Sequence, residues 1–206
     1  MIYLFIIIVF LFSVIIHEIA HGAVANHLGD PTAKDAGRLN LNPLRHLDPI
    51  GSVIVPLFLF LSSRVAGGGV IFGWAKPVPI NPYNFRDKKY GEMKVAAAGP
   101  LANFSLALAF GLLLRFMPLT PSLVEMFSYI AFINIQLAVF NLLPIPPLDG
   151  SHILLAFLPG LERFKMFFQS YGFFLLVLVV FFLYPFLLYI IDKIFWLFAG
   201  FPILSS

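Results

Sequence analysis

The sequence predicts an all-α polytopic membrane protein, with about five to six transmembrane helices and a re-entrant, extended β-like segment near residues 65–80. Of its 206 residues, 60% are hydrophobic and only 11% are charged, and the mean hydropathy is +0.95. Apolar runs recur along the whole chain and are separated by short basic loops, a pattern typical of multi-pass membrane proteins. The length fits one membrane-embedded domain, residues 1–206, and leaves no room for a separate soluble domain.

The first predicted helix covers residues 2–28. Its first half, Ile2 to Ile16, is apolar without interruption, and the helix ends near Gly29. The apolar run lacks a basic start and continues directly into a polar motif. We therefore expect a retained membrane span and not a cleaved signal peptide.

The last third of this helix carries the pattern H-E-x-x-H, formed by His17, Glu18 and His21. Histidines four positions apart share one helix face, so two imidazoles can bind one metal ion. Glu18 can reach the outer side of the ion, where an activated water would lie, as in zinc hydrolases. The alternative is a histidine pair satisfied by hydrogen bonds. However, ionisable side chains within a membrane helix are costly and are generally functional. Without cysteine, any metal must take His, Asp or Glu, which favours an open catalytic site.

Residues 29–94 leave two topologies open. Residues 29–49 and 81–94 are polar and basic, and between them lies a short apolar run followed by an extended stretch. If residues 50–64 cross the membrane, the two basic loops lie on opposite faces. If residues 50–80 enter and return, the loops share a face, which the positive-inside bias favours. Irregular backbone at that depth is tolerated only against protein or a wet cavity.

Two further spans are predicted, over about residues 92–116 and 122–143. The first begins with small residues that allow another helix to approach closely. Asn103 is the only strongly polar side chain near its middle. From the residues alone, Asn103 is equally compatible with an interhelical hydrogen bond.

The second of these spans ends at a proline-rich segment that delivers Asp149. Pro144, Pro146 and Pro147 cannot continue a regular helix, and a short helix is expected from there to about residue 158. By itself, Asp149 could be a helix cap. Beside a two-histidine site it is the best candidate for the third metal ligand, and His152 is its rival.

The C-terminal part predicts a span over residues 167–184, a break at Pro185, and a final short span or interfacial helix over residues 186–200. Placing the basic loops in the cytoplasm puts the N-terminus outside. The first span then brings His17 and His21 towards the cytoplasmic leaflet, and the span after residue 122 brings Asp149 to the same leaflet.

Together these motifs resemble the site-2 protease family of intramembrane zinc metalloproteases, in its compact prokaryotic form. The resemblance rests on the segments HEIAHG at 17–22, GPLANF at 99–104, NLLPIPPLDG at 141–150, DPIG at 48–51 and GWAKPVP at 73–79. It implies one zinc ion per chain, bound by His17, His21 and Asp149, with Glu18 as the general base. It also implies that Asn103 holds the substrate backbone or the oxyanion, and a location in the prokaryotic inner membrane.

The implied activity is hydrolysis of a peptide bond within or near the transmembrane helix of a single-span membrane protein, for regulated proteolysis or for clearing signal-peptide remnants. The expected partners are this substrate and the lipid bilayer. Nucleic acid is not expected, and neither a PDZ-like insertion nor a nucleotide-binding regulatory domain is present in the sequence. Two alternatives are a metal-ion or proton transporter, which the absence of inverted repeats disfavours, and a catalytically inactive helix-binding scaffold. The sequence leaves the substrate and the oligomeric state open.

Overall fold

The computed structural model of the chain describes residues 2–46, 76–157 and 162–203. Regular structure in these residues is helical, as the sequence predicts. The α-helices and 3-10 helices (η) are α1 (Ile2–His27), α2 (Thr32–Asp35), η1 (Pro43–Arg45), η3 (Pro82–Asn84), α4 (Gly91–Phe116), α5 (Pro121–Asn141), α6 (Asp149–Ala156) and α7 (Glu162–Ala199).

Four helical segments in the described residues are long and apolar enough to cross a membrane: α1, α4, α5 and residues Phe181–Ala199 of α7. The expected span over residues 50–64 lies outside the described residues. So does most of the β-like segment expected near residues 65–80, and its described part, residues 76–80, contains no strand. The multi-pass helical architecture is therefore confirmed, and the β-like segment is not observed.

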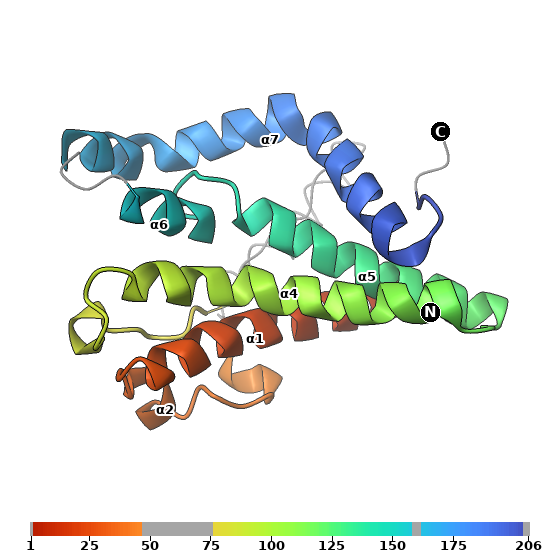
Figure 1. Ribbon diagram of the computed structural model, residues 1–206, viewed down its shortest axis with the longest axis horizontal. Coiled ribbons are helices and arrows are strands. Elements are labelled where there is room, and N and C mark those ends of the chain that lie inside the picture. Colours follow the sequence, from red (N-terminus) through yellow and green to blue (C-terminus); the bar gives the residue numbers. More distant parts are fainter. Residues whose placement is uncertain (1, 47–75, 158–161, 204–206) are drawn as a thin grey trace, which may run out of the picture.

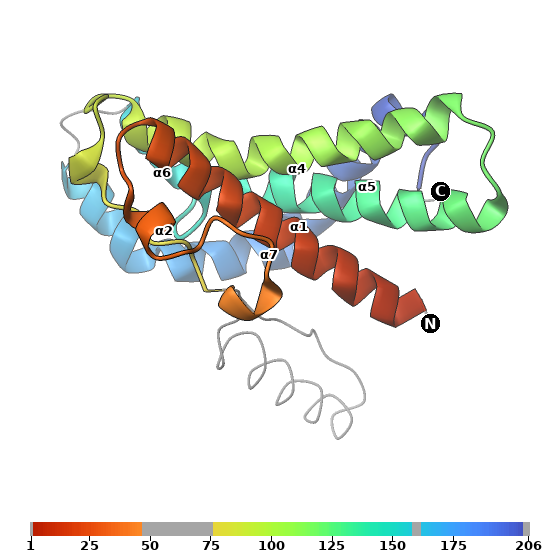
Figure 2. The ribbon, with the colours of Figure 1, turned by 90° about the horizontal axis from the view of Figure 1, so that it is seen from below.

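Helix α4 is the centre of the bundle, in contact with α1, α5, α6 and α7 (Figures 1 and 2). Small residues let the neighbouring helices approach its backbone closely. At Gly111, for example, an added Cβ would lie 2.5 Å from the Cβ of Phe198 on α7. The main apolar core joins α4, α5 and α7 through Ala107, Leu114, Ala131, Ile135, Val139, Leu187, Ile191, Phe195 and Ala199.

The predicted break at Pro185 is wrong, because α7 continues through this proline. A proline removes one backbone donor and crowds the carbonyl four residues earlier, which kinks a helix without necessarily ending it. Figure 1 shows α7 as one ribbon that changes direction along its length. Beyond the proline, Leu187, Ile191 and Phe195 are buried in the core. Packing there, and the cost of exposing unpaired backbone groups to lipid, favour a kink over a break.

A buried carboxylate, Asp30, ties the segment after residue 76 to the end of α1. Asp30 accepts hydrogen bonds from the backbone N–H of Asn81 at 2.7 Å and from the side-chain amide of Asn84 at 2.8 Å. Thr32 adds its hydroxyl and its backbone N–H. Burial opposes ionisation, but these hydrogen bonds outweigh it and place the pKa of Asp30 below its usual value. This group of hydrogen bonds to Asp30, which we call the clamp, fixes residues 81–84 beside the helix that carries the H-E-x-x-H motif.

Candidate metal centre

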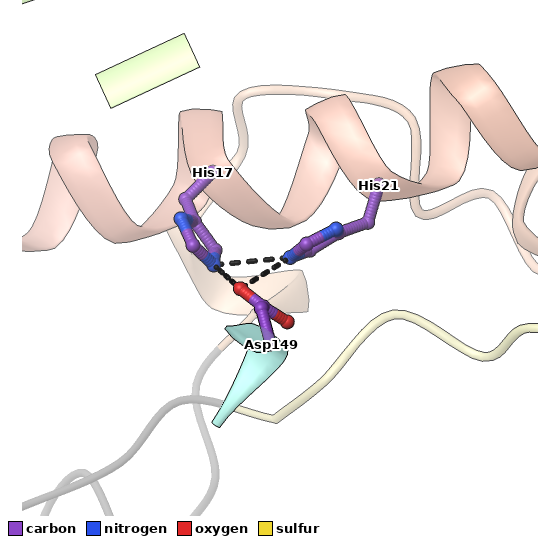
Figure 3. Close-up of side chains that lie close together, drawn as sticks. All are labelled: His17, His21 and Asp149. Atoms are coloured by element: carbon purple, nitrogen blue, oxygen red, sulfur yellow. Dashed lines mark hydrogen bonds and ion pairs between the residues drawn. The ribbon is translucent and has the colours of Figure 1, made fainter. Parts of the chain in front are cut away.

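Three side chains from two distant parts of the sequence converge in the membrane bundle (Figure 3). The Nε2 atoms of His17 and His21, one turn apart on α1, are separated by 3.0 Å. The Oδ2 atom of Asp149, at the start of α6, lies 3.1 Å from His17 Nε2 and 3.3 Å from His21 Nε2. Each histidine is only 7% exposed. The structure therefore brings together the three residues predicted as metal ligands.

Asp149 reaches the histidines because the chain folds tightly between α5 and α6. Helix α5 ends at Asn141, and backbone hydrogen bonds between residues close in sequence, such as Leu148 N–H to Ile145 C=O, then hold the proline-rich turn together. Gly150 is essential to this fold, since a Cβ there would lie 2.2 Å from the carbonyl oxygen of Leu142. The DG pair thus combines a ligand with the one residue type that the turn can accommodate beside it.

The hydrogen bonds of the two rings determine which nitrogen faces the site. His21 Nδ1 lies 2.7 Å from the carbonyl oxygen of Val95, which can only accept, so Nδ1 carries the proton. His17 Nδ1 lies 2.7 Å from the side-chain oxygen of Asn103 and is a donor for the same reason. In the neutral rings, both Nε2 atoms therefore direct lone pairs towards each other and towards Asp149. This is the tautomer that metal-binding histidines require.

Three converging acceptor atoms offer a position for one cation. Asp149 Oδ2 is buried and receives no hydrogen bond from the described residues. Unpaired acceptors buried in this way are costly, and a divalent cation would satisfy all three. In tetrahedral zinc sites with metal–ligand distances of about 2.0–2.1 Å, neighbouring ligand atoms lie about 3.3 Å apart. The observed separations of 3.0, 3.1 and 3.3 Å fit such an ion.

Gly99 on α4 provides the space that the two rings occupy. An added Cβ would lie 2.5 Å from His17 Cε1 and 2.5 Å from His21 Nε2. The sequence predicted that the small residues of this segment serve helix packing. At Gly99, the structure shows that the neighbour being accommodated is the histidine pair itself.

Glu18 lies beside the ligand group and is held from outside α1. Its Oε2 atom accepts a hydrogen bond of 2.8 Å from the backbone N–H of Val78, in the segment that follows residue 76. Val78 is buried, whereas Glu18 is half-buried. One oxygen therefore orients the carboxylate, and the other has no hydrogen bond from the described residues.

Asn103 contacts only protein groups in the described structure, so the substrate-holding or oxyanion role that the resemblance implied stays a prediction. The side chain is fully buried, and its Nδ2 donates to Asn134 Oδ1 at 2.8 Å and to the backbone carbonyl of Ser13 at 3.2 Å. Both amide hydrogens are thus engaged, and Oδ1 accepts from His17. These contacts show an interhelical hydrogen bond that also orients His17, a candidate metal ligand.

The structure also places the rival ligand His152 and two polar residues that were not predicted, Ser13 and Asn134. His152, the rival ligand, is exposed and lies outside the group formed by His17, His21 and Asp149. Ser13 and Asn134 contact Asn103, which in turn contacts His17, and neither was predicted from the sequence. The available signal was that each is a polar residue within an apolar membrane span.

Comparisons with known proteins identify the family. The model of "Peptidase family M50" matches residues 117–183. "Putative zinc metalloprotease YwhC" of Bacillus subtilis is 38% identical over 191 residues, covering 88% of this chain and 81% of the relative. "Putative zinc metalloprotease Rip2" of Mycolicibacterium smegmatis is 32% identical over 174 residues, covering 82% of this chain and 64% of the relative. No solved structure matches the chain. With this identity to YwhC over most of both chains, the protein belongs to peptidase family M50, the site-2 protease family that the motifs indicated.

Proposed function

We propose that this protein is an intramembrane zinc metalloprotease that hydrolyses a peptide bond within or near the transmembrane helix of a membrane-protein substrate. The observation that carries the proposal is the convergence of His17, His21 and Asp149 in a bundle of membrane-spanning helices. Zinc is supported by the spacing of the three ligand atoms and by the names of the relatives. Residues 1–206 form the single domain that carries this activity.

The proposed ligands are Nε2 of His17, Nε2 of His21 and Oδ2 of Asp149, with one zinc ion per chain. When bound, zinc supplies Lewis acidity, which polarises a carbonyl group and makes water a nucleophile at neutral pH. Asn103 and the carbonyl of Val95 keep the two imidazoles in the tautomer that presents Nε2. Three protein ligands leave a further position for the reaction, which is the usual difference between catalytic and structural zinc sites.

Glu18 is the proposed general base. It follows His17 directly in the sequence, and its Oε2 is oriented by the Val78 N–H. The free carboxylate oxygen would take a proton from the attacking water and return it to the leaving amine. The substrate helix must unwind locally before its carbonyl can reach the site, because a helix hides its backbone.

The histidines of the site lie within α1, about one to three helical turns before its C-terminal end. His17 and His21 precede the last residue of α1, His27, by ten and six residues, or about 15 and 9 Å along the helix axis. The loop after α1 carries Lys34 and Arg38, so the positive-inside bias places this end in the cytoplasm. We infer an active site within the cytoplasmic leaflet of a prokaryotic inner membrane, acting on single-span substrates.

The test is cleavage of a panel of single-span peptides by the purified protein in nanodiscs, with the products mapped by mass spectrometry. We expect cleavage inside or beside the apolar segment, its loss with a zinc chelator, and its recovery when zinc is restored. Glu18→Gln should retain zinc and lose cleavage. Stoichiometric zinc with no cleavage of any peptide, or metal uptake into sealed vesicles instead, would refute the proposed activity.

A further inference from the structure

A chain of buried polar side chains leads from the metal centre into the helix bundle. Beyond Asn103, it continues to Asn134 on α5 and from there to Ser13 on α1. Asn103 Nδ2 lies 2.8 Å from Asn134 Oδ1, and Asn134 Nδ2 lies 2.9 Å from Ser13 Oγ. Asn103, Asn134 and Ser13 are 0%, 1% and 3% exposed. Three membrane helices thus contribute polar atoms to a network that ends on one metal ligand.

The orientation of the Asn134 amide is fixed by its own helix. Asn134 Nδ2 lies 2.9 Å from the carbonyl oxygen of Ile130, which can only accept a hydrogen bond. The NH2 group, and not the oxygen, must therefore face Ile130 and Ser13. The remaining oxygen, Oδ1, then faces Asn103 as an acceptor.

The orientation of the Asn103 amide is fixed by its neighbours in the same way. Its Nδ2 faces two acceptors, Asn134 Oδ1 and the carbonyl oxygen of Ser13. A flipped amide would bring its oxygen against both of these oxygens, an unfavourable contact between acceptors in the bundle interior. Oδ1 of Asn103 therefore faces His17, and His17 must donate from Nδ1.

We propose that Asn134, supported by Ser13, is a positioning residue for the metal centre: it fixes the amide orientation of Asn103 and thereby the tautomer and ring orientation of His17. The proposal rests on the proposed function, because the tautomer of His17 matters only if its Nε2 binds the metal. Asn134 touches neither the metal ligands nor the site directly, and it acts through Asn103.

A purely structural role makes a different prediction. Polar side chains in membrane helices often hold neighbouring helices together, and removing one then lowers stability alone. A positioning role predicts in addition that zinc affinity and the His17 tautomer change by more than the loss of stability accounts for. Groups that orient metal ligands typically contribute about 10–100-fold to metal affinity.

Three variants of adjacent positions on α5 separate these roles. Asn134→Leu removes the acceptor that holds Asn103. Asn134→Asp keeps an acceptor oxygen towards Asn103 at nearly the same size and tests rescue. Ile135→Ala is the matched control, because Ile135 is a fully buried core residue of the same helix and its substitution destabilises the bundle without removing a polar contact.

Zinc affinity is measured in nanodiscs by competition with a chromophoric chelator, with thermal unfolding of the apo-protein and the absorption spectrum of the Co²⁺ form as parallel readouts. We expect Asn134→Leu to bind zinc about 10–100-fold more weakly and to alter the Co²⁺ spectrum. Asn134→Asp keeps the acceptor towards Asn103 but loses the NH2 group that faces Ile130, so its zinc affinity should lie between those of the wild type and Asn134→Leu. Ile135→Ala should unfold at a lower temperature with unchanged zinc affinity. Wild-type zinc affinity in Asn134→Leu would overturn the proposal, as would a loss equal to that of Ile135→Ala.

Nitrogen NMR of the histidine-labelled wild-type apo-protein provides a test that does not depend on folding of a variant. His17 should be protonated at Nδ1, the nitrogen that faces Asn103, and an unprotonated Nδ1 would overturn the proposal. The two proposals fail differently. A wild-type protein that binds no zinc contradicts the proposed function, whereas a zinc-binding wild type with an unaffected Asn134→Leu variant contradicts only the role of Asn134.

Discussion

Substitution of Gly99 by alanine is the smallest change that should disable the metal centre. The added methyl carbon would lie 2.5 Å from His17 Cε1 and His21 Nε2, and 2.6 Å from His17 Nε2. Non-bonded carbon contacts are comfortable only at about 3.5 Å or more, so one of the two partners must move by about 1 Å. Zinc sites tolerate deviations of about 0.2 Å in ligand distance. Gly99→Ala should therefore lose most of its zinc affinity, and an active-site displacement of about 1 Å can cost about 100-fold in rate.

The control for this prediction lies on the same helix. Gly111→Ala places a methyl carbon 2.5 Å from Phe198 Cβ, a clash of the same depth but far from the histidines. Overpacking of this kind typically costs about 1–3 kcal/mol, which the better helix propensity of alanine offsets by up to about 1 kcal/mol. Both variants should thus lose similar stability.

Zinc content by elemental analysis, zinc affinity by chelator competition and thermal unfolding compare the two variants directly. Gly99→Ala should be depleted of zinc, and Gly111→Ala should bind zinc like the wild type. Full zinc affinity and activity in Gly99→Ala would mean that α4 does not pack against the rings as described. Equal zinc loss in both variants would mean that general destabilisation empties the site.

Three further predictions follow from single contacts. Asp149→Ala should abolish high-affinity zinc binding, whereas His152→Ala should leave it unchanged in the same chelator titration, because His152 is exposed and outside the ligand group. The pKa of Asp30 is lower in the folded than in the unfolded protein, where it is about 3.9. The ionised carboxylate therefore stabilises the fold at pH values above about 3.9, and this stabilisation is lost as the pH falls through the folded-state pKa. Acid unfolding followed by circular dichroism should therefore be less steep for Asp30→Asn than for the wild type, and an unchanged profile would remove the carboxylate from the clamp. Zinc at a thousandfold excess over its Kd should raise the free energy of unfolding of the apo-protein by about 4 kcal/mol, because zinc binds only the folded state. A denaturation midpoint that zinc does not change would contradict this binding.

The three candidate metal ligands were predictable from the sequence because their signals are local. The helical period places His17 and His21 on one face, and three closely spaced prolines mark where the chain unwinds before Asp149. Neither inference needs knowledge of how the helices cross. The convergence of the two segments was expected from the predicted membrane topology, in which both spans approach the same leaflet.

The supporting residues were not predictable in this way, because their roles depend on packing. Whether Gly99 faces a helix or an imidazole depends on the rotation of α4 against α1. The roles of Asn103 and Asn134 depend on which atoms their amides meet, and no spacing in the sequence encodes that. Pro185 illustrates the same point for the backbone: the rule that proline ends helices is local, and burial of Leu187, Ile191 and Phe195 beyond it favours continuation.

The polar atoms around the site form hydrogen bonds with one another across helix interfaces, so helix packing and metal binding should be coupled. Each amide and each Nδ1 in the network is paired across a helix interface, and such pairs are not readily exchanged for water in an apolar bundle. The atoms left over are the three that face the proposed ion. In the described residues, this pairing leaves the histidine Nε2 atoms and the Asp149 carboxylate facing one another, an arrangement that one cation would stabilise. The packing that holds α1, α4 and α5 together would thus also preorganise the proposed ligands before an ion binds.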